Sequence, residues 1–170
     1  WLLDFDDILI YCHRLLTEDP GLRDRWKNRF RYILIDEFQD INDVQYQIIK
    51  LLCANCENLF VVGDDDQAIY SFRGADPSYM HLFLEDFPKS RQVKLNINYR
   101  CGDRILALAA RSIAHNKYRF KKEIKAGNSG ENWVITACFQ NRAEELSFLT
   151  EEILTHRNEG LTAILVRTNR

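Results

Sequence analysis

The stretch RYILIDEFQD, residues 31–40, changes abruptly from an apolar run to a dense polar cluster. The apolar part, residues 32–35, lacks alternation with polar residues, which is typical of a parallel strand covered on both faces. In open parallel sheets, ligands bind beyond the carboxyl ends of the strands. A binding site is therefore expected where this strand ends, and the polar side chains at that point are Asp36, Glu37, Gln39 and Asp40.

An apolar strand that ends in Asp36 and Glu37 has the pattern of a Walker B segment. In that pattern the first carboxylate holds Mg²⁺, and the second orients and deprotonates an attacking water. A solvated turn is the alternative, because apolar strands followed by acidic turns are common. The stretch by itself leaves both interpretations open.

A second apolar run, NLFVVG at residues 58–63, precedes the polar string DDDQAIYSFRGA at residues 64–75. Between the two runs, apolar residues recur on one face of a helix expected at residues 43–54. This helix would return the chain to the second strand. Strand, helix and strand at this spacing predict a right-handed βαβ unit.

Apolar spacing and turn residues predict the remaining elements of the chain. Helices are expected near residues 5–19, 22–30, 76–88, 102–115 and 141–156, and strands near residues 92–95, 133–139 and 163–167. With 170 residues and 46% hydrophobic content, the chain can bury a sizeable core. These elements indicate an α/β fold.

Two strings together, DEFQD at residues 36–40 and GDDDQAIYSFRGA at residues 63–75, resemble motifs II and III of the superfamily 1 helicases of the UvrD, Rep and PcrA type. LDFDDIL at residues 3–9 is similar to the segment that precedes motif II in that family. LNINYRC at residues 95–101 resembles motif IV, and AILVRTNR at residues 163–170 is similar to a strand of the second motor domain. The resemblance covers nearly the whole chain, in the family's order.

The resemblance implies a RecA-like P-loop NTPase fold, a parallel sheet flanked by helices, in parts of two tandem motor domains. Residues 1–90, with a helical lead-in at residues 1–30, would form the C-terminal part of the first domain, and residues 91–170 the N-terminal part of the second. No G-x-x-x-x-G-K-[ST] string occurs in the sequence. The chain is therefore expected to be an internal piece that acts with the missing parts of its polypeptide and, alone, neither hydrolyses ATP nor binds it tightly.

The resemblance also implies roles for the polar residues that follow the two strands. Asp36 would hold Mg²⁺ bridging two phosphates of ATP, and Glu37 would polarise the hydrolytic water. Gln39 and Gln67 would be neutral hydrogen-bonding sensors, because an amide can both donate to the γ-phosphate and accept from water. ATP and Mg²⁺ are the cofactors implied.

Two residues of the string that resembles motif IV would enter the nucleotide site from the second domain. Tyr99 is expected to stack on the adenine of ATP. Arg100 is expected to act as an arginine finger on the γ-phosphate, which would make hydrolysis depend on closure of the cleft.

The loop after Gln67 carries residues suited to bind single-stranded DNA. Tyr70 and Phe72 could stack on bases for about 1–3 kcal/mol each, and Arg73 could contact phosphate or the acidic cluster. Packing of both rings inside the domain is the alternative. The family usually has tryptophan where Phe72 stands, and phenylalanine keeps a stacking face with less area and no indole N–H.

The function implied is ATP-driven 3′ to 5′ movement on single-stranded DNA with unwinding of duplex DNA, in DNA repair or replication. Three alternatives remain open from the sequence. The two acidic clusters could hold paired metal ions in a nuclease. The chain could instead be a non-catalytic DNA-binding module with a degenerate motor, or the motor part of a helicase–nuclease subunit.

Composition adds constraints on location and partners. The formal net charge of −2 gives no broad basic surface, so contact with DNA must come from local features. Five cysteines without a secretory or transmembrane context predict free thiols in a reducing cytoplasm and no membrane partner. The pair Cys53 and Cys56 is expected to be structural. The basic stretch at residues 117–125 could touch a phosphate backbone or form a solvated loop.

Overall fold

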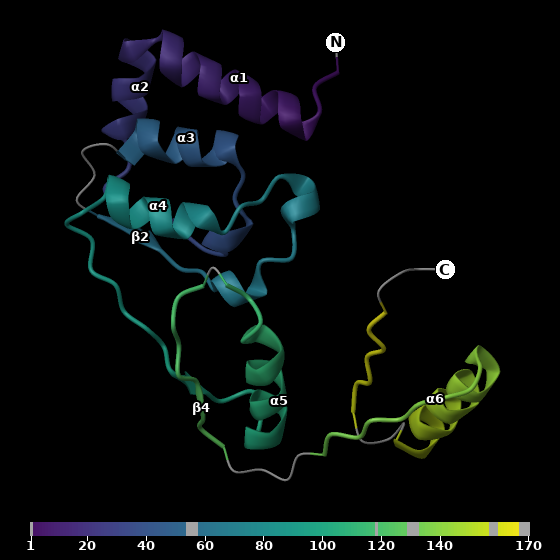
Figure 1. The fold of residues 1–170 in the computed structure, drawn as a ribbon. Helices are drawn as coiled ribbons and strands as arrows, with labels where there is room; N and C mark the ends of the chain where they lie inside the picture. The colour runs from purple at the N-terminus through teal and green to yellow at the C-terminus, as the bar shows by residue number, and fades with distance from the viewer. Residues whose placement is uncertain (1, 54–57, 118, 129–132, 157–159, 167–170) are drawn as a thin grey trace. The chain divides into compact units, whose positions relative to one another are not determined.

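The computed structural model describes residues 2–53, 58–117, 119–128, 133–156 and 160–166 (Figure 1). Packing divides the chain into two compact units, residues 1–130 and 131–170. The described residues form an α/β fold with small parallel sheets. The predicted α/β class is therefore confirmed.

The central feature of the first unit is a parallel strand pair with a connecting helix. Strand β1 (Ile33–Ile35) is followed by helix α3 (Asp43–Cys53), and strand β2 (Leu59–Val61) pairs with β1 in parallel, Ile33 opposite Leu59. This arrangement confirms the predicted strand, helix and strand. Because the strands are parallel, the polar strings that follow them start at the same edge of the sheet.

Two helices precede the strand pair and cover α3. Helix α1 (Phe5–Glu18) begins at a capping box, in which the Asp4 carboxylate accepts a hydrogen bond from the Asp7 amide at 2.8 Å. Helix α2 (Pro20–Lys27) starts with proline in its first turn, where the missing N–H costs nothing. Both helices pack against α3.

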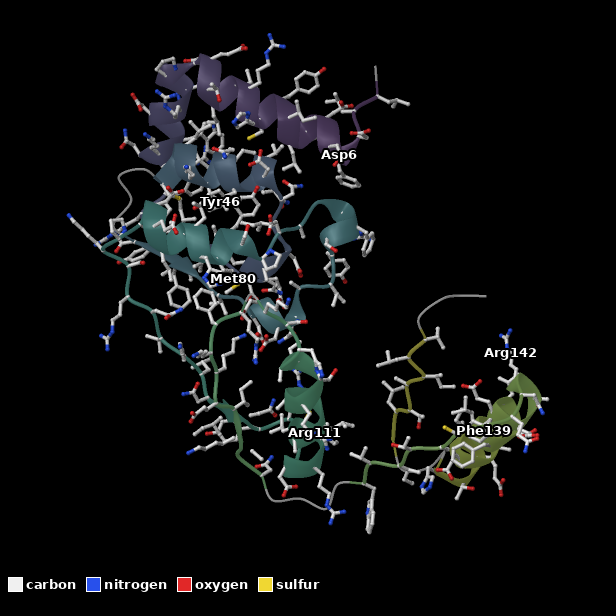
Figure 2. All side chains as sticks on the ribbon, in the orientation of Figure 1. Asp6, Tyr46, Met80, Arg111, Phe139 and Arg142 are labelled. Atoms are coloured by element: carbon white, nitrogen blue, oxygen red, sulfur yellow. The ribbon has the colours of Figure 1, made fainter. Side chains whose placement is uncertain are left out.

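The hydrophobic core lies directly beneath the turn that follows β1. Its buried residues are Phe38, Ile41, Tyr46 and Phe83, and the last belongs to helix α4 (Ser78–Asp86). The Phe38 and Phe83 rings meet edge to face at 5.4 Å. Figure 2 shows Tyr46 between α3 and α4, where its hydroxyl donates to an Asp86 carboxylate oxygen at 2.8 Å. The core therefore fixes the position of the polar turn.

A second strand pair lies further along the first unit. Strand β3 (Ile97–Asn98) pairs in parallel with β4 (Lys125–Ala126), and helix α5 (Asp103–Ile113) lies between them in the chain. The strand predicted at residues 92–95 is wrong, because those residues form no strand. The ladder starts only where β4 supplies partners, with the Lys125 amide donating to the Asn96 carbonyl at 2.8 Å.

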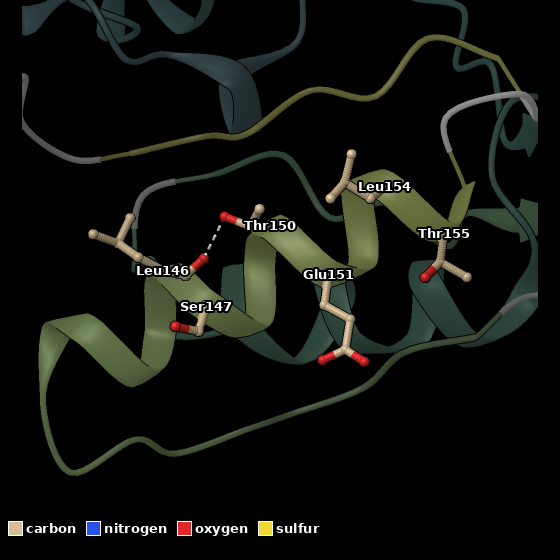
Figure 3. A pocket seen from close by; sticks show the side chains of 6 residues that line it. All are labelled: Leu146, Ser147, Thr150, Glu151, Leu154 and Thr155. Carbon is tan, nitrogen blue, oxygen red and sulfur yellow. Dashed lines mark hydrogen bonds between the residues drawn. The ribbon is translucent and has the colours of Figure 1, made fainter.

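The second unit contains helix α6 (Arg142–His156), close to the prediction. The strand predicted at residues 133–139 is wrong, and residues 163–166 are not a strand either, while position 167 lies outside the described residues. An open hollow lies along α6 (Figure 3), lined by Leu146, Ser147, Thr150, Glu151, Leu154 and Thr155. Since one helix supplies its whole lining, we assign it no role.

Three of the described cysteines carry free thiols: Cys12, Cys101 and Cys138. Cys56 lies outside the described residues, so the structural role predicted for the Cys53–Cys56 pair stays a prediction. Among the described helices, none combines the length and apolar character that crossing a bilayer requires.

Candidate functional site

The turn after β1 presents two carboxylates to solvent from an unusual backbone. Glu37 has φ 50° and ψ 44°, the left-handed region that non-glycine residues rarely adopt. Asp36 Oδ1 accepts a hydrogen bond from the Glu37 amide at 2.9 Å. Both side chains are exposed, as ligands of an incoming group must be. Such strain is often found at functional sites because the surrounding structure must enforce it.

Gln39 connects this turn to the loop after β2. Its side chain is 1% exposed, its Nε2 donates to Glu37 Oε2 at 2.8 Å, and its Oε1 accepts from the Asp64 amide at 2.9 Å. The sequence assigned this amide to the nucleotide, and the structure gives it two partners within the protein. Gln39 thus holds the Glu37 carboxylate in a fixed relation to the second loop.

Gly63 permits the close approach of the two loops. A Cβ at this position would lie 2.9 Å from Gln39 Oε1 and 3.2 Å from the amide nitrogens of Phe38 and Gln39. The two backbone atoms cannot move without disturbing the core. Glycine is therefore required here for space.

Gly63→Ala is expected to push Gln39 away and to destabilise the chain by about 1–3 kcal/mol, the usual effect of overpacking a rigid site. Urea unfolding followed by circular dichroism would measure the loss. Gly21→Ala is the matched control, because outside its own helix backbone its Cβ would meet one side-chain atom, Asp19 Oδ1 at 3.3 Å, and no backbone atom. Equal stability of the two variants would contradict the close contact.

The loop after β2 places Gln67 beside the first of three successive aspartates. The 3₁₀ turn η2 (Asp65–Gln67) is capped by Asp64, whose carboxylate accepts from the Asp66 amide at 3.2 Å. Gln67 Nε2 donates to the other oxygen of Asp64 at 2.8 Å. Gln67 is exposed and reaches the Glu37 turn through Asp64 and Gln39. The structure thus brings together three of the predicted catalytic residues, Asp36, Glu37 and Gln67, in one hydrogen-bonded group.

The next turn, η3 (Ser71–Arg73), together with Tyr70 directly before it, carries an exposed cluster of two rings and one cation. Phe72 is 75% exposed and Tyr70 is 37% exposed. The Arg73 guanidinium lies 5.3 Å from the Tyr70 ring centre and 5.5 Å from that of Phe72. Packing of these rings in the core, the alternative left open by the sequence, is wrong. We call these three residues the aromatic cluster.

Tyr99 and Arg100 follow β3 and are both exposed. The Tyr99 ring lies against Gly127, where a Cβ would come within 2.5 Å of it, and the Arg100 amide donates to Asn98 Oδ1 at 2.9 Å. Within the described residues, no hydrogen bond, ion pair or ring contact joins either side chain to the Glu37 turn. Their predicted roles at the nucleotide stay predictions.

Two cations that the sequence pattern did not predict neutralise the three aspartates, Asp64, Asp65 and Asp66. Arg119 binds Asp66 with two hydrogen bonds, 2.7 Å from Nε and 2.5 Å from Nη2, and the Lys122 ammonium pairs with Asp64 and Asp65. The sequence signals were three adjacent carboxylates and, more than fifty residues away, the basic stretch at residues 117–125. Their oxygens lie within 4.8 Å of one another, a spacing that could hold a metal ion, but Lys122 occupies this position. This arrangement disfavours the two-metal nuclease.

The sequence matches two protein-family models over nearly the whole chain. Residues 1–88 match the UvrD/REP helicase N-terminal domain, and residues 93–170 match the UvrD-like helicase C-terminal domain. The chain therefore belongs to the UvrD/REP helicase family, which confirms the resemblance drawn from its motifs.

Individual relatives agree with this assignment. The chain is 41% identical over 175 residues to the ATP-dependent DNA helicase Rep of Escherichia coli (strain K12), which covers 99% of the chain and 26% of that protein. It is 38% identical over 171 residues to the ATP-dependent DNA helicase PcrA of Staphylococcus epidermidis, covering 98% of the chain and 24% of the relative. The chain spans about a quarter of the length of the curated relatives it matches.

Proposed function

We propose that the chain forms part of the motor of an ATP-dependent DNA helicase that moves 3′ to 5′ along single-stranded DNA and separates duplexes. The observation that carries this proposal is the hydrogen-bonded link between the Glu37 turn and the loop that holds Gln67 and the aromatic cluster. One short loop thereby connects a candidate hydrolytic carboxylate to a candidate DNA grip. Similarity to proteins named ATP-dependent DNA helicases supports it.

We further propose two tandem RecA-like domains, residues 1–90 and 91–170. The family matches, which end at residue 88 and resume at residue 93, support a boundary between them. The two parallel pairs, each with an intervening helix, also support a repeated architecture. The compact unit of residues 1–130 extends past this proposed boundary, because it also includes β3, α5 and β4.

The exposed Asp36 carboxylate suits a hard cation, because Mg²⁺ prefers carboxylate oxygens. When bound with ATP, Mg²⁺ neutralises phosphate charge. Glu37 then orients a water molecule and takes its proton, while Gln39 keeps the Glu37 carboxylate in place. Gln67, which is joined to Glu37 through Asp64 and Gln39, would respond to the γ-phosphate through the same network, and Arg100 would complete the site when the domains close.

A strand-separation assay on the full-length protein tests the proposal. Duplexes with a 3′ single-stranded tail should be separated in the presence of ATP and Mg²⁺, and duplexes with a 5′ tail should remain paired. A non-hydrolysable ATP analogue should give no separation. Separation without nucleotide, or equal separation of both substrates, would contradict the proposed activity or its polarity.

Phe72→Ala tests the DNA grip separately from the chemistry. Loss of one stacking contact, worth about 1–3 kcal/mol, should lower the number of base pairs separated per ATP hydrolysed, while ATP hydrolysis persists. Both rates would be measured at fixed salt, because phosphate contacts depend strongly on ionic strength. Phe5→Ala is the matched control, because Phe5 is 87% exposed on a different helix. Unchanged separation per ATP in Phe72→Ala would remove Phe72 from the DNA track.

A further inference from the structure

Residues 119–122, which we call the strap, bind the three aspartates at several points. Arg119 holds Asp66 through two parallel hydrogen bonds from one edge of its guanidinium, and the Phe120 amide donates to Asp65 Oδ2 at 2.6 Å. Lys122 Nζ pairs with Asp64 and Asp65 and lies 3.3 Å from Asp66 Oδ2. These contacts join positions more than fifty residues apart, so they fix tertiary structure.

A ring contact adds to these charged contacts. The Phe120 ring stacks on the His81 imidazole of α4, with centroids 4.0 Å apart and planes inclined by 14°. The stack sits next to the Phe120 amide that binds Asp65. The strap is therefore held by a ring as well as by ion pairs.

The ion pairs of the strap are largely removed from water. The side chains of Lys122 and Arg119 are 16% and 20% exposed, and that of Asp65 is 2% exposed. Charges buried to this extent interact strongly, and removing one partner leaves the other unpaired in a poorly solvated place. The strap is thus unlike a solvated basic loop, which was one of the two interpretations of residues 117–125.

The ionisation of the central pair is stable around neutral pH. Burial acts to lower the pKa of Lys122, but the hydrogen bonds and charges of Asp64 and Asp65 raise that pKa above its usual value. Burial acts to raise the pKa of Asp64, but hydrogen bonds from Lys122 and Gln67 lower it below its usual value. The stabilisation by Asp64 is lost only as pH falls through its lowered pKa, and that by Lys122 only as pH rises through its raised pKa.

A continuous path of contacts leads from the strap to the candidate hydrolytic carboxylate. Lys122 binds the Asp64 carboxylate, the Asp64 amide donates to Gln39 Oε1 at 2.9 Å, and Gln39 Nε2 donates to Glu37 Oε2 at 2.8 Å. The same Asp64 carboxylate accepts from Gln67 at 2.8 Å. Asp64 is thus the junction at which Lys122, Gln39 and Gln67 meet.

This path of contacts also joins the two regions of the chain that match different family domains. Asp64 and His81 belong to the region matched by the N-terminal domain, whereas the strap belongs to the region matched by the C-terminal domain. A change in the position of the strap would therefore reach Glu37 through side-chain contacts and the Asp64 amide, without following the chain between residues 64 and 119.

We propose that Lys122 is a positioning residue for ATP hydrolysis, which through Asp64 and Gln39 orients Glu37 and through Asp64 orients Gln67. Arg119 and the stack of Phe120 on His81 keep Lys122 in place. This inference rests on the proposed function, because it assigns Lys122 a role in the same reaction. The strap binds no ATP or DNA in this role.

Lys122→Met in the full-length protein tests the proposal, because methionine keeps most of the chain length and removes the charge. The kcat for ATP hydrolysis should fall about ten- to hundredfold, the effect of slightly misplacing a reacting group, while the KM for ATP stays within about twofold. Lys121→Met, next in the chain and exposed, should leave both constants unchanged. Lys122→Arg, which keeps the charge, should recover most of the lost kcat.

Hydrogen–deuterium exchange on the same proteins reports the path without using activity. In Lys122→Met, peptides that cover residues 36–41 and 62–68 should exchange about tenfold faster, because their linking hydrogen bonds loosen. Helix α3 serves as the internal reference and should keep its rate. The double variant Asp64→Asn/Lys122→Met removes one of the carboxylates that Lys122 neutralises, so it leaves less unpaired charge than the single variant. Its kcat should match that of Asp64→Asn, because the proposed effect of Lys122 passes through Asp64.

The outcomes separate this inference from the proposed function. A parent protein without ATPase activity would overturn both. An active parent with unchanged kcat and unchanged exchange in Lys122→Met would overturn only the role of Lys122. Equal acceleration of exchange across α3 and both loops would also overturn it, because that result indicates a general loss of stability.

Discussion

Glu37→Gln in the full-length protein is expected to remove nearly all ATP turnover, about 10²- to 10⁴-fold, the usual contribution of a positioned general base. Glutamine keeps the length of the side chain and an oxygen that can accept the hydrogen bond from Gln39 Nε2. It cannot take a proton from water. Binding of ATP and of single-stranded DNA should therefore remain, and only hydrolysis should be lost.

Steady-state phosphate release in the presence of single-stranded DNA measures the loss, and fluorescence titration measures the two binding affinities. Glu85→Gln is the matched control, because Glu85 is exposed on α4 and lies outside the Glu37 turn. Phosphate release at the parental rate in Glu37→Gln would show that Glu37 is not the base. Loss of ATP binding would point to a structural role for this carboxylate.

Arg100→Ala is expected to reduce turnover about 10³- to 10⁵-fold, the range observed for arginine fingers. The side chain is exposed, and within the described residues it makes no ion pair, so its removal should leave the fold intact. Arg100→Lys should recover only part of the activity, because an ammonium group lacks the planar pair of donors. Phosphate release and thermal unfolding, measured together, separate the two effects.

Arg91→Ala provides the control for Arg100→Ala. Arg91 is likewise exposed and precedes β3 in the same part of the chain. Parental turnover in Arg100→Ala would exclude the finger. A large fall in melting temperature would instead indicate that Arg100 supports the fold.

The elements with strong local signals were predicted well. Strands β1 and β2 are short apolar runs with helix α3 between them, and their pairing in parallel follows from the geometry of such units. The polar turn was also found, because ligands bind where parallel strands end. Exposure of Phe72 could not be predicted, since sequence alone does not say which aromatic residues pack in a core.

The contacts between distant segments were not predictable from local pattern. The strap lies more than fifty residues from the aspartates it binds, and neither segment signals its partner by spacing. The role of Gln39 as a bridge was not predicted for the same reason, because its Oε1 accepts a hydrogen bond from the amide of Asp64, 25 residues further along the chain. The prediction of a strand at residues 92–95 failed for a similar reason, because an apolar run alone cannot specify the strand with which it pairs.

The make-up of the aromatic cluster determines how this part of a DNA track would respond to ionic strength. Each phosphate neutralised on a single strand adds about 0.7 to the slope of log affinity against log salt, whereas stacking adds little. Arg73 is the single cation among the three residues, and Tyr70 and Phe72 supply faces without charge. The contribution of the cluster to binding should thus vary only weakly between dilute and concentrated salt, so that this contact would persist when counterions displace purely electrostatic ones.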